Sequence, residues 1–162
     1  IASVDAKETK DGYMTRSQSS QYRIPVKDIS KLAEEHGAGE LVINSVDRDG
    51  MRSGYDIDLL SLVGAGLEIP TIALGGAGHP SHIVEAMKLP AISAVAVGNM
   101  FNHMEHSVAI AKAFLAKTTI HVRQATNFDY SFDQFDEDGR LLKKAETRFD
   151  DLGALCLESD VL

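Results

Sequence analysis

The stretch that decides the fold spans residues 41–78, LVINSVDRDGMRSGYDIDLLSLVGAGLEIPTIALGGAG. It opens with Leu41–Val46, a run of aliphatic and β-branched residues that predicts a buried strand. After a polar loop, Asp56–Gly64 carries apolar residues at helical spacing and predicts a helix with Asp56 near its cap. Pro70–Leu74 is a second short apolar run, and Gly75-Gly76-Ala77-Gly78 follows it directly. The order strand, helix, strand predicts a βα unit on a parallel sheet.

The same alternation continues on both sides of this stretch, so the sequence predicts an α/β fold in which four strands alternate with helices. Both barrels and doubly wound sheets are built in this way, and both place function at the carboxyl ends of their strands. The other expected elements are a strand at Ile1–Ala6, a polar loop or small hairpin at Lys7–Ile24, a helix at Val26–His36, a helix at Ser81–Lys88, a strand at Ile92–Val97, a helix at Asn102–Ala116 and an extended piece at Thr119–Val122.

The composition excludes several classes of protein. The chain has 162 residues, 44% of them hydrophobic and 25% charged, as in an ordinary globular domain. Its net charge of −8 gives no electrostatic reason to expect nucleic acid as a partner. No apolar run approaches the roughly 18 residues of a membrane span. The single cysteine, Cys156, excludes an internal disulfide framework and fits a reducing, cytoplasmic compartment.

Two parts of the chain differ in character. Residues 1–123 hold the βα pattern and form the expected domain, whereas residues 124–162 are acidic and rich in aromatic residues. In this extension Asp138-Gly139 predicts a hairpin turn. Because chains are initiated with Met and this one begins at Ile1 with a strand-like run, we expect it to be the C-terminal part of a longer polypeptide or one piece of a split one.

Polar residues follow three of the predicted strands. Asp5 follows the first, Asp47 and Asp49 follow the second, and the glycines of 75–78 follow the third. Carboxylates at such a position can act as general acid or base if the site raises one pKa. The alternative is a solvated turn, since Asp and Gly are ordinary turn residues.

Two loops are candidates for binding a phosphate. Gly75–Gly78 and Gly98-Asn99 each lie between a strand and a helix, where free backbone N–H groups can meet an anion. Gly75–Gly78 is neither a dinucleotide fingerprint nor a P-loop, and a tight turn is the alternative for it. Two such loops after consecutive strands make the phosphate interpretation stronger, because paired phosphate loops recur in βα barrels.

Histidines occur at spacing three, as His79 with His82 and His103 with His106. Zinc needs at least a third protein ligand, and neither pair has an obvious one. We therefore expect exposed histidines, no metal and no cofactor.

The segment 37–56, with its core NSVDRDG at 44–50, resembles the cyclase subunit of imidazole glycerol phosphate synthase. Asp5-Ala-Lys7 resembles the family's fifth-strand signature, Gly75–Gly78 its seventh-strand phosphate loop and Val97–Phe101 its eighth-strand loop. The resemblance covers about residues 1–123. It implies the C-terminal half of a TIM (β/α)8 barrel.

The resemblance also implies an activity. The family takes ammonia from a glutaminase partner, cleaves and cyclises a phosphorylated ribonucleotide, and forms imidazole glycerol phosphate and aminoimidazole carboxamide ribonucleotide in histidine biosynthesis. Asp5 matches the family's catalytic aspartate of the second half-barrel. The other matching residues are Ser45, Asp47, Asp49 and Gly50 in the substrate loop, Gly75, Gly76, Gly98 and Asn99 at a substrate phosphate, and Glu40 at the ammonia entrance.

The sequence departs from the family in ways that leave alternatives open. Asn44 stands where the usual cyclase has Thr, and Gly98-Asn99 where it has Ala-Ser. Asn44 and the segment Asn99-Met-Phe are more similar to divergent paralogues tied to sugar amidation in surface-polysaccharide synthesis. The first four βα units are absent, so we expect the chain to pair with an N-terminal half-barrel or with itself. A non-catalytic half-barrel that serves as an assembly partner is a further alternative.

Overall fold

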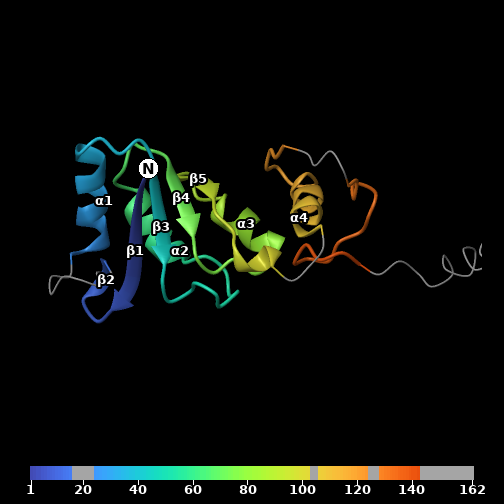
Figure 1. The fold of residues 1–162 in the computed structure, drawn as a ribbon, viewed down its shortest axis with the longest axis horizontal. Coiled ribbons are helices and arrows are strands. Elements are labelled where there is room, and N and C mark those ends of the chain that lie inside the picture. The colour runs from blue at the N-terminus through green and yellow to red at the C-terminus, as the bar shows by residue number, and fades with distance from the viewer. Residues whose placement is uncertain (16–23, 103–105, 124–127, 143–162) are drawn as a thin grey trace, which may run out of the picture.

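A computed structural model describes residues 1–15, 24–102, 106–123 and 128–142. Its centre is a five-stranded sheet in the order β2-β1-β3-β4-β5 (Figure 1). The elements are β1 (Ala2–Thr9), β2 (Gly12–Thr15), α1 (Val26–Glu35), β3 (Leu41–Ser45), α2 (Ile57–Gly64), β4 (Thr71–Leu74), α3 (Pro80–Ala86), β5 (Ile92–Val95), the 3-10 helix η1 (Asn99–Phe101) and α4 (Ser107–Leu115). β1, β3, β4 and β5 are parallel and β2 is antiparallel. This is the predicted α/β fold, and it is consistent with part of a (β/α)8 barrel.

Three predicted elements differ from the structure at the ends of the molecule. β1 extends to Thr9 because β2 folds back on it, which places the predicted hairpin at residues 6–15. The predicted helix Asn102–Ala116 was wrong at its start, since η1 ends at Phe101 and α4 begins only at Ser107. Thr119–Val122 forms no strand, because Ile120 and Val122 pack on the side-chain cluster of α3 and α4 and not beside a strand.

The described part of the acidic extension packs on α3 and α4. Phe135 meets the ring of Phe114 edge-on, and the backbone N–H of Ser81 donates to the Asp138 carbonyl over 3.2 Å. The predicted turn is present, with Gly139 at φ +81° and a single antiparallel bridge between Phe135 and Leu141. Cys156 lies outside the described residues.

One face of the sheet forms the main core. Val4, Ile43 and Ala73 are register partners on this face, and all three are buried against side chains of α1, α2 and α3. The sequence makes this possible because alternate residues of a strand point to the same face. We call this the covered face.

The opposite face is accessible. It carries two rows of register partners: Ser3, Val42 and Ile72 in one row, and Asp5, Asn44 and Leu74 in the next row toward the carboxyl ends. Ser3 and Asp5 are exposed, and the other four are half-buried. We call this the open face. In the complete barrel of this fold the corresponding face points to the barrel interior.

Candidate functional site

Asp5 lies on the open face in the middle of β1, near the carboxyl end of the segment Ala2–Ala6 that pairs in parallel with β3. Its partner is Asn44, directly across in β3, whose Nδ2 donates to Asp5 Oδ1 over 2.9 Å. Lys7 lies two residues beyond Asp5, but none of the ion pairs found among the described residues joins them. Residues two apart on a strand share a face without touching, so the contact comes from the neighbouring strand.

The carboxylates of the loop after β3 have different surroundings. Asp47 Oδ2 accepts a hydrogen bond from the backbone N–H of Glu8 over 2.8 Å, which ties this loop to the end of β1. Asp49 is exposed, and its backbone N–H donates to the carbonyl of Ser45. Gly50 follows at φ +78°, a conformation that favours glycine. Asp49 is therefore the carboxylate of this loop that is free to meet a ligand.

A buried network around Asp56 was not expected from the sequence beyond a helix cap. Asp56 caps α2 by accepting from the N–H of Leu59, and it also accepts from the hydroxyls of Ser45 and Tyr13 over 3.2 and 3.0 Å. Burial, and then the contact with Asp56, raise the pKa of Tyr13 to about 12. Ser45 lies on the covered face and is only 3% exposed, so the structure does not bring its hydroxyl to Asp5.

The glycines after β4 are packed against backbone. Gly75 and Gly76 have φ of +90° and +104°. A Cβ at Gly76 would lie 2.1 Å from the Gly54 carbonyl oxygen, and one at Gly78 would lie 2.4 Å from that of Arg52. The N–H of Gly78 donates to His82 Nδ1 over 3.1 Å. Close contact with the loop after β3 therefore explains these glycines without a phosphate.

Gly98 and Asn99, after β5, are exposed. A Cβ at Gly50 would lie 3.4 Å from Asn99 Nδ2, so this loop and the loop after β3 meet. The buried Tyr55 adds a tie that the sequence did not signal, since its hydroxyl donates to the Ala96 carbonyl over 3.0 Å. The loops after β3, β4 and β5 thus converge at the carboxyl ends of these parallel strands.

Glu40 lies at the opposite end of the parallel strands, directly before β3. Its carbonyl accepts from the N–H of Ala2, at the amino ends of β1 and β3. From Glu40 to Asn44 is four residues, about 13 Å along an extended strand. Glu40 and Asp5 therefore stand toward opposite ends of the paired parallel strands.

His79 and His82 are half-buried and not exposed as expected, whereas His106 is exposed as expected and His103 lies outside the described residues. His79 and His82 stack with ring centroids 4.7 Å apart, and His79 contacts Asp138 and Arg140 of the extension. Burial, and then the neighbouring His79, lower the pKa of His82. A neutral His82 fits its role as acceptor for Gly78. Within the described ranges no group of three or more His, Cys, Asp or Glu is placed to hold a metal ion.

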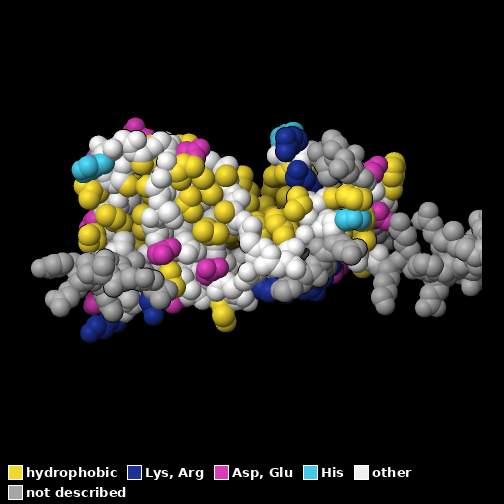
Figure 2. Space-filling model, in the orientation of Figure 1, with side chains coloured by type: hydrophobic (Ala, Val, Ile, Leu, Met, Phe, Trp, Pro, Cys, Tyr) yellow, Lys and Arg dark blue, Asp and Glu magenta, His cyan; other side chains and the backbone are white. Residues whose placement is uncertain are grey.

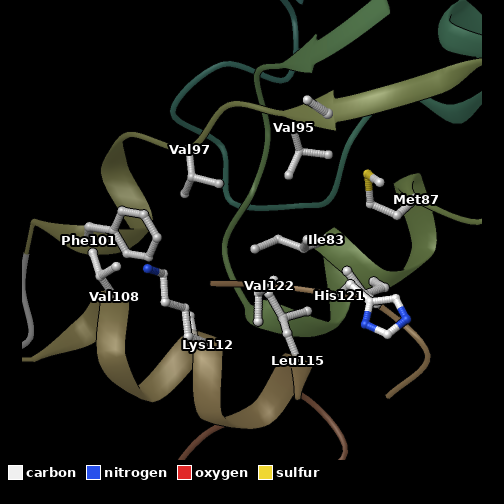
Figure 3. Close-up of a pocket in the computed structure, with 13 residues that line it drawn as sticks. Ile83, Met87, Val95, Val97, Phe101, Val108, Lys112, Leu115, His121 and Val122 are labelled. Atoms are coloured by element: carbon white, nitrogen blue, oxygen red, sulfur yellow. The ribbon is translucent and has the colours of Figure 1, made fainter. Parts of the chain in front are cut away.

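A pocket of about 330 Å³ lies between β5, α3 and α4 (Figure 3). Its walls are apolar, with Val95, Ile83 and Leu115 facing one another and Lys112 and His121 also contributing to the lining. None of the predicted site residues lines it. Figure 2 shows the hydrophobic surface that continues from the sheet into this hollow.

No helix of the described segments is long and apolar enough to cross a membrane.

Comparison with known proteins agrees with this architecture. A protein of Vibrio vulnificus (strain YJ016), provisionally named imidazole glycerol phosphate synthase subunit hisF2, is 41% identical over 114 residues. The match covers 67% of this chain and 42% of that protein. Imidazole glycerol phosphate synthase subunits HisF of Hydrogenobaculum sp. (strain Y04AAS1) and Chlorobium limicola (strain DSM 245 / NBRC 103803 / 6330) are 35% and 33% identical. Each of these two matches covers 76% of this chain and 50% of the relative.

The chain thus spans about half the length of the relatives that it matches. The profile of the histidine biosynthesis protein family matches residues 1–107, about two thirds of the 162 residues. This range includes all four parallel strands and every predicted site residue. The chain therefore belongs to the histidine biosynthesis protein family.

Proposed function

We propose that residues 1–123 act as four βα units of an ammonia-dependent cyclase/lyase of histidine biosynthesis, with residues 124–162 as an extension. Relatives named as imidazole glycerol phosphate synthase subunits support the activity. The observation that carries it is the position of Asp5, exposed on the open face near the carboxyl end of Ala2–Ala6, the part of β1 that pairs in parallel with β3, where the chemistry of such barrels gathers. The single cysteine fits a cytoplasmic enzyme.

In this proposal Asp5 is the catalytic carboxylate. Cleavage and ring closure to imidazole glycerol phosphate and aminoimidazole carboxamide ribonucleotide require proton transfers. An ionised Asp5 takes a proton from the bound substrate and returns it to the leaving part, as a general base and then a general acid. Asn44 already occupies Oδ1 of Asp5, so the other carboxylate oxygen exchanges the proton.

Three loops hold the substrate in this proposal. Asp49 and the backbone around Gly50 bind its hydroxyls, and Asp47 keeps their loop in place through Glu8. Ser45 acts indirectly, by fixing Asp56 at the start of α2. The N–H groups at the Gly75-Gly76 and Gly98-Asn99 turns bind one phosphate, since glycines allow backbone to approach an anion closely.

Ammonia comes from a glutaminase partner that docks at the Glu40 end of the strands. The separation of Glu40 from Asp5 along the strands supports this arrangement, because the nucleophile then enters on the side opposite to the substrate. The open face is covered either by an N-terminal half-barrel or by a second copy of the chain. Half-exposed Val42, Ile72 and Leu74 support such a cover, since contiguous exposed apolar surface marks an interface.

A second candidate function rests on Asn44 and Asn99. These two residues lie at the proposed site and resemble the paralogues of sugar amidation in surface-polysaccharide synthesis. Under this alternative the same ammonia route serves another phosphorylated or nucleotide-linked sugar. A half-barrel that only assists assembly is the remaining alternative.

The experiment is ammonia-dependent turnover of the family substrate by the chain alone and by the chain mixed with a family N-terminal half-barrel. We expect little or no turnover from the chain alone and clear turnover from the mixture. Turnover of an amidated sugar in place of this substrate would favour the second candidate. A mixture that binds but turns over neither substrate would leave only the assembly role.

A further inference from the structure

We propose that Asn44 is the positioning residue for Asp5, which it holds in one orientation on the open face. The inference rests on the proposed function, in which Asp5 transfers the proton. Asn44 is absent from the residues that the resemblance assigns to the site, and it stands where the usual cyclase has Thr. Its role therefore follows from the contacts of this chain.

The register of the sheet creates the contact. Asp5 and Asn44 are paired residues of the parallel strands β1 and β3, so their side chains leave the sheet side by side on the same face. Asn44 Nδ2 donates to Asp5 Oδ1 over 2.9 Å, a hydrogen bond to a charged acceptor. Such bonds are roughly twice as strong as those between neutral groups.

The other end of the same amide is fixed by the glycine loop. A Cβ at Gly75 would lie only 2.8 Å from Asn44 Oδ1, so the amide is closely packed between Asp5 and the backbone after β4. Any larger residue at 75 would displace it. Asn44 therefore links the proposed catalytic carboxylate to the proposed phosphate loop.

The orientation of the amide identifies which contact determines it. Asn44 Oδ1 is buried, and among the described residues it has no hydrogen-bond partner. A buried acceptor without a partner is unfavourable, because it has lost its hydrogen bonds to water and gained none in return. Rotating the amide by half a turn would bring Oδ1 against the Asp5 carboxylate, where two acceptors repel. The favourable hydrogen bond from Asn44 Nδ2 to Asp5 thus outweighs the cost of leaving Asn44 Oδ1 without a partner among the described residues.

The consequence for catalysis is geometric. With Oδ1 of Asp5 held by Asn44, Oδ2 is presented to the substrate from one fixed direction. Proton transfer needs the base within hydrogen-bond reach in a productive pose. Without Asn44 the exposed carboxylate would sample several rotamers and spend less time in that pose.

The first test measures the orientation of Asp5 directly. Three-bond carbon–nitrogen and carbon–carbon couplings across its χ1 angle are recorded by NMR in the full chain. Wild type should show one rotamer, Asn44→Ala should show averaging, and Asn44→Thr should restore one rotamer because its hydroxyl can donate. Val42→Ala, on the same face of β3, is the matched control and should behave as wild type. Wild-type couplings in Asn44→Ala would overturn the inference.

The second test measures turnover in the mixture that the proposed function requires. Asn44→Ala should lower kcat about ten- to hundredfold, the worth of a hydrogen bond to a charged group, with KM unchanged. Asn44→Asp should do at least the same, because it keeps the shape but removes the donor. Asn44→Thr should recover most of kcat. A change in KM alone, or an unchanged kcat in Asn44→Ala, would contradict a positioning role.

The two failures can be told apart. If the wild-type mixture turns over no substrate, the proposed function fails, and the couplings alone decide whether Asn44 positions Asp5. If wild type turns over but Asn44→Ala equals it, the proposed function stands and the inference is wrong.

Discussion

The two faces of the sheet differ although the same strands form both, since alternate residues of each strand point to opposite faces. On the covered face Val4, Ile43 and Ala73 are at most 6% exposed and form one core with the helices. On the open face Asp5 is exposed, and Asn44 is half-buried beside it. The covered face is therefore specialised for stability, whereas the open face combines the proposed catalytic carboxylate with half-buried apolar side chains.

The open face is itself divided. Its polar residues Ser3, Asp5 and Asn44 lie on β1 and β3, and its apolar residues include Ile72 and Leu74 on β4. A catalytic site needs polar side chains, whereas an interface with another chain needs apolar surface. Each of the following predictions compares a change on one surface with a matched change on another.

The largest effect on stability should come from the covered face. Ile43 is fully buried, so Ile43→Ala should lower the free energy of unfolding by about 2–5 kcal/mol. Val42→Ala, the neighbouring residue on the open face, should cost less than about 1 kcal/mol, since Val42 is only half-buried. Urea unfolding of both variants measures this. Equal losses would mean that the open face is packed as tightly as the covered one.

The glycine loop should give the next effect. Gly76→Ala places a Cβ 2.1 Å from the Gly54 carbonyl oxygen at φ +104°, so about 2–4 kcal/mol of stability should be lost. Gly39→Ala is the control, because a Cβ there meets nothing within 4 Å. If Gly76→Ala unfolds like wild type but loses affinity for phosphate, the loop serves the ligand more than the fold.

The interface role of the open face predicts association. At micromolar concentration the chain should sediment faster than a monomer, and Ile72→Glu should weaken this association at least about tenfold because a charge is buried without a partner. Ile72 is half-buried on the open face, so the isolated fold should tolerate the change. A monodisperse wild-type monomer that binds no hydrophobic dye would rule out self-association.

The smallest effect concerns His82. Its pKa is lowered by burial and by His79, whereas Glu85 and Asp138 oppose this. Between the lowered value and the ordinary 6.5, the unfolded chain binds the proton and the folded chain does not. Stability should therefore fall as the pH drops through this window. His82→Asn, which keeps an acceptor for Gly78 but cannot titrate, should remove this part of the pH dependence in urea unfolding.

Much of the architecture could be predicted from the sequence because strand and helix periodicities are local. The run Leu41–Val46 and the helix with Asp56 as its cap correspond to β3 and α2. The start of α4 could not be predicted, since the apolar pattern runs on through η1 and does not mark its end. The Asp56 network joins residues 43 apart in sequence, and no local signal announces such a contact.

The candidate site was predictable in its parts and not in their contacts. Alternation along β3 places Asn44 on one face and Ser45 on the other, so the separation of Ser45 from Asp5 could have been found from the pattern. The pairing of Asp5 with Asn44 needs the register of two strands, which the sequence does not state. The glycines of 75–78 were interpreted through their freedom to bind phosphate, whereas close backbone contacts also require them.

The most direct test of the division between the two faces is Asp5→Asn, measured for both turnover and stability. Asp5 is exposed, so the substitution should leave the free energy of unfolding within about 0.5 kcal/mol of wild type. In the mixture with an N-terminal half-barrel, it should lower ammonia-dependent turnover by about 10²–10⁴. Full turnover in Asp5→Asn would contradict the assignment of the chemistry to the open face, and so would a loss of turnover that only follows unfolding.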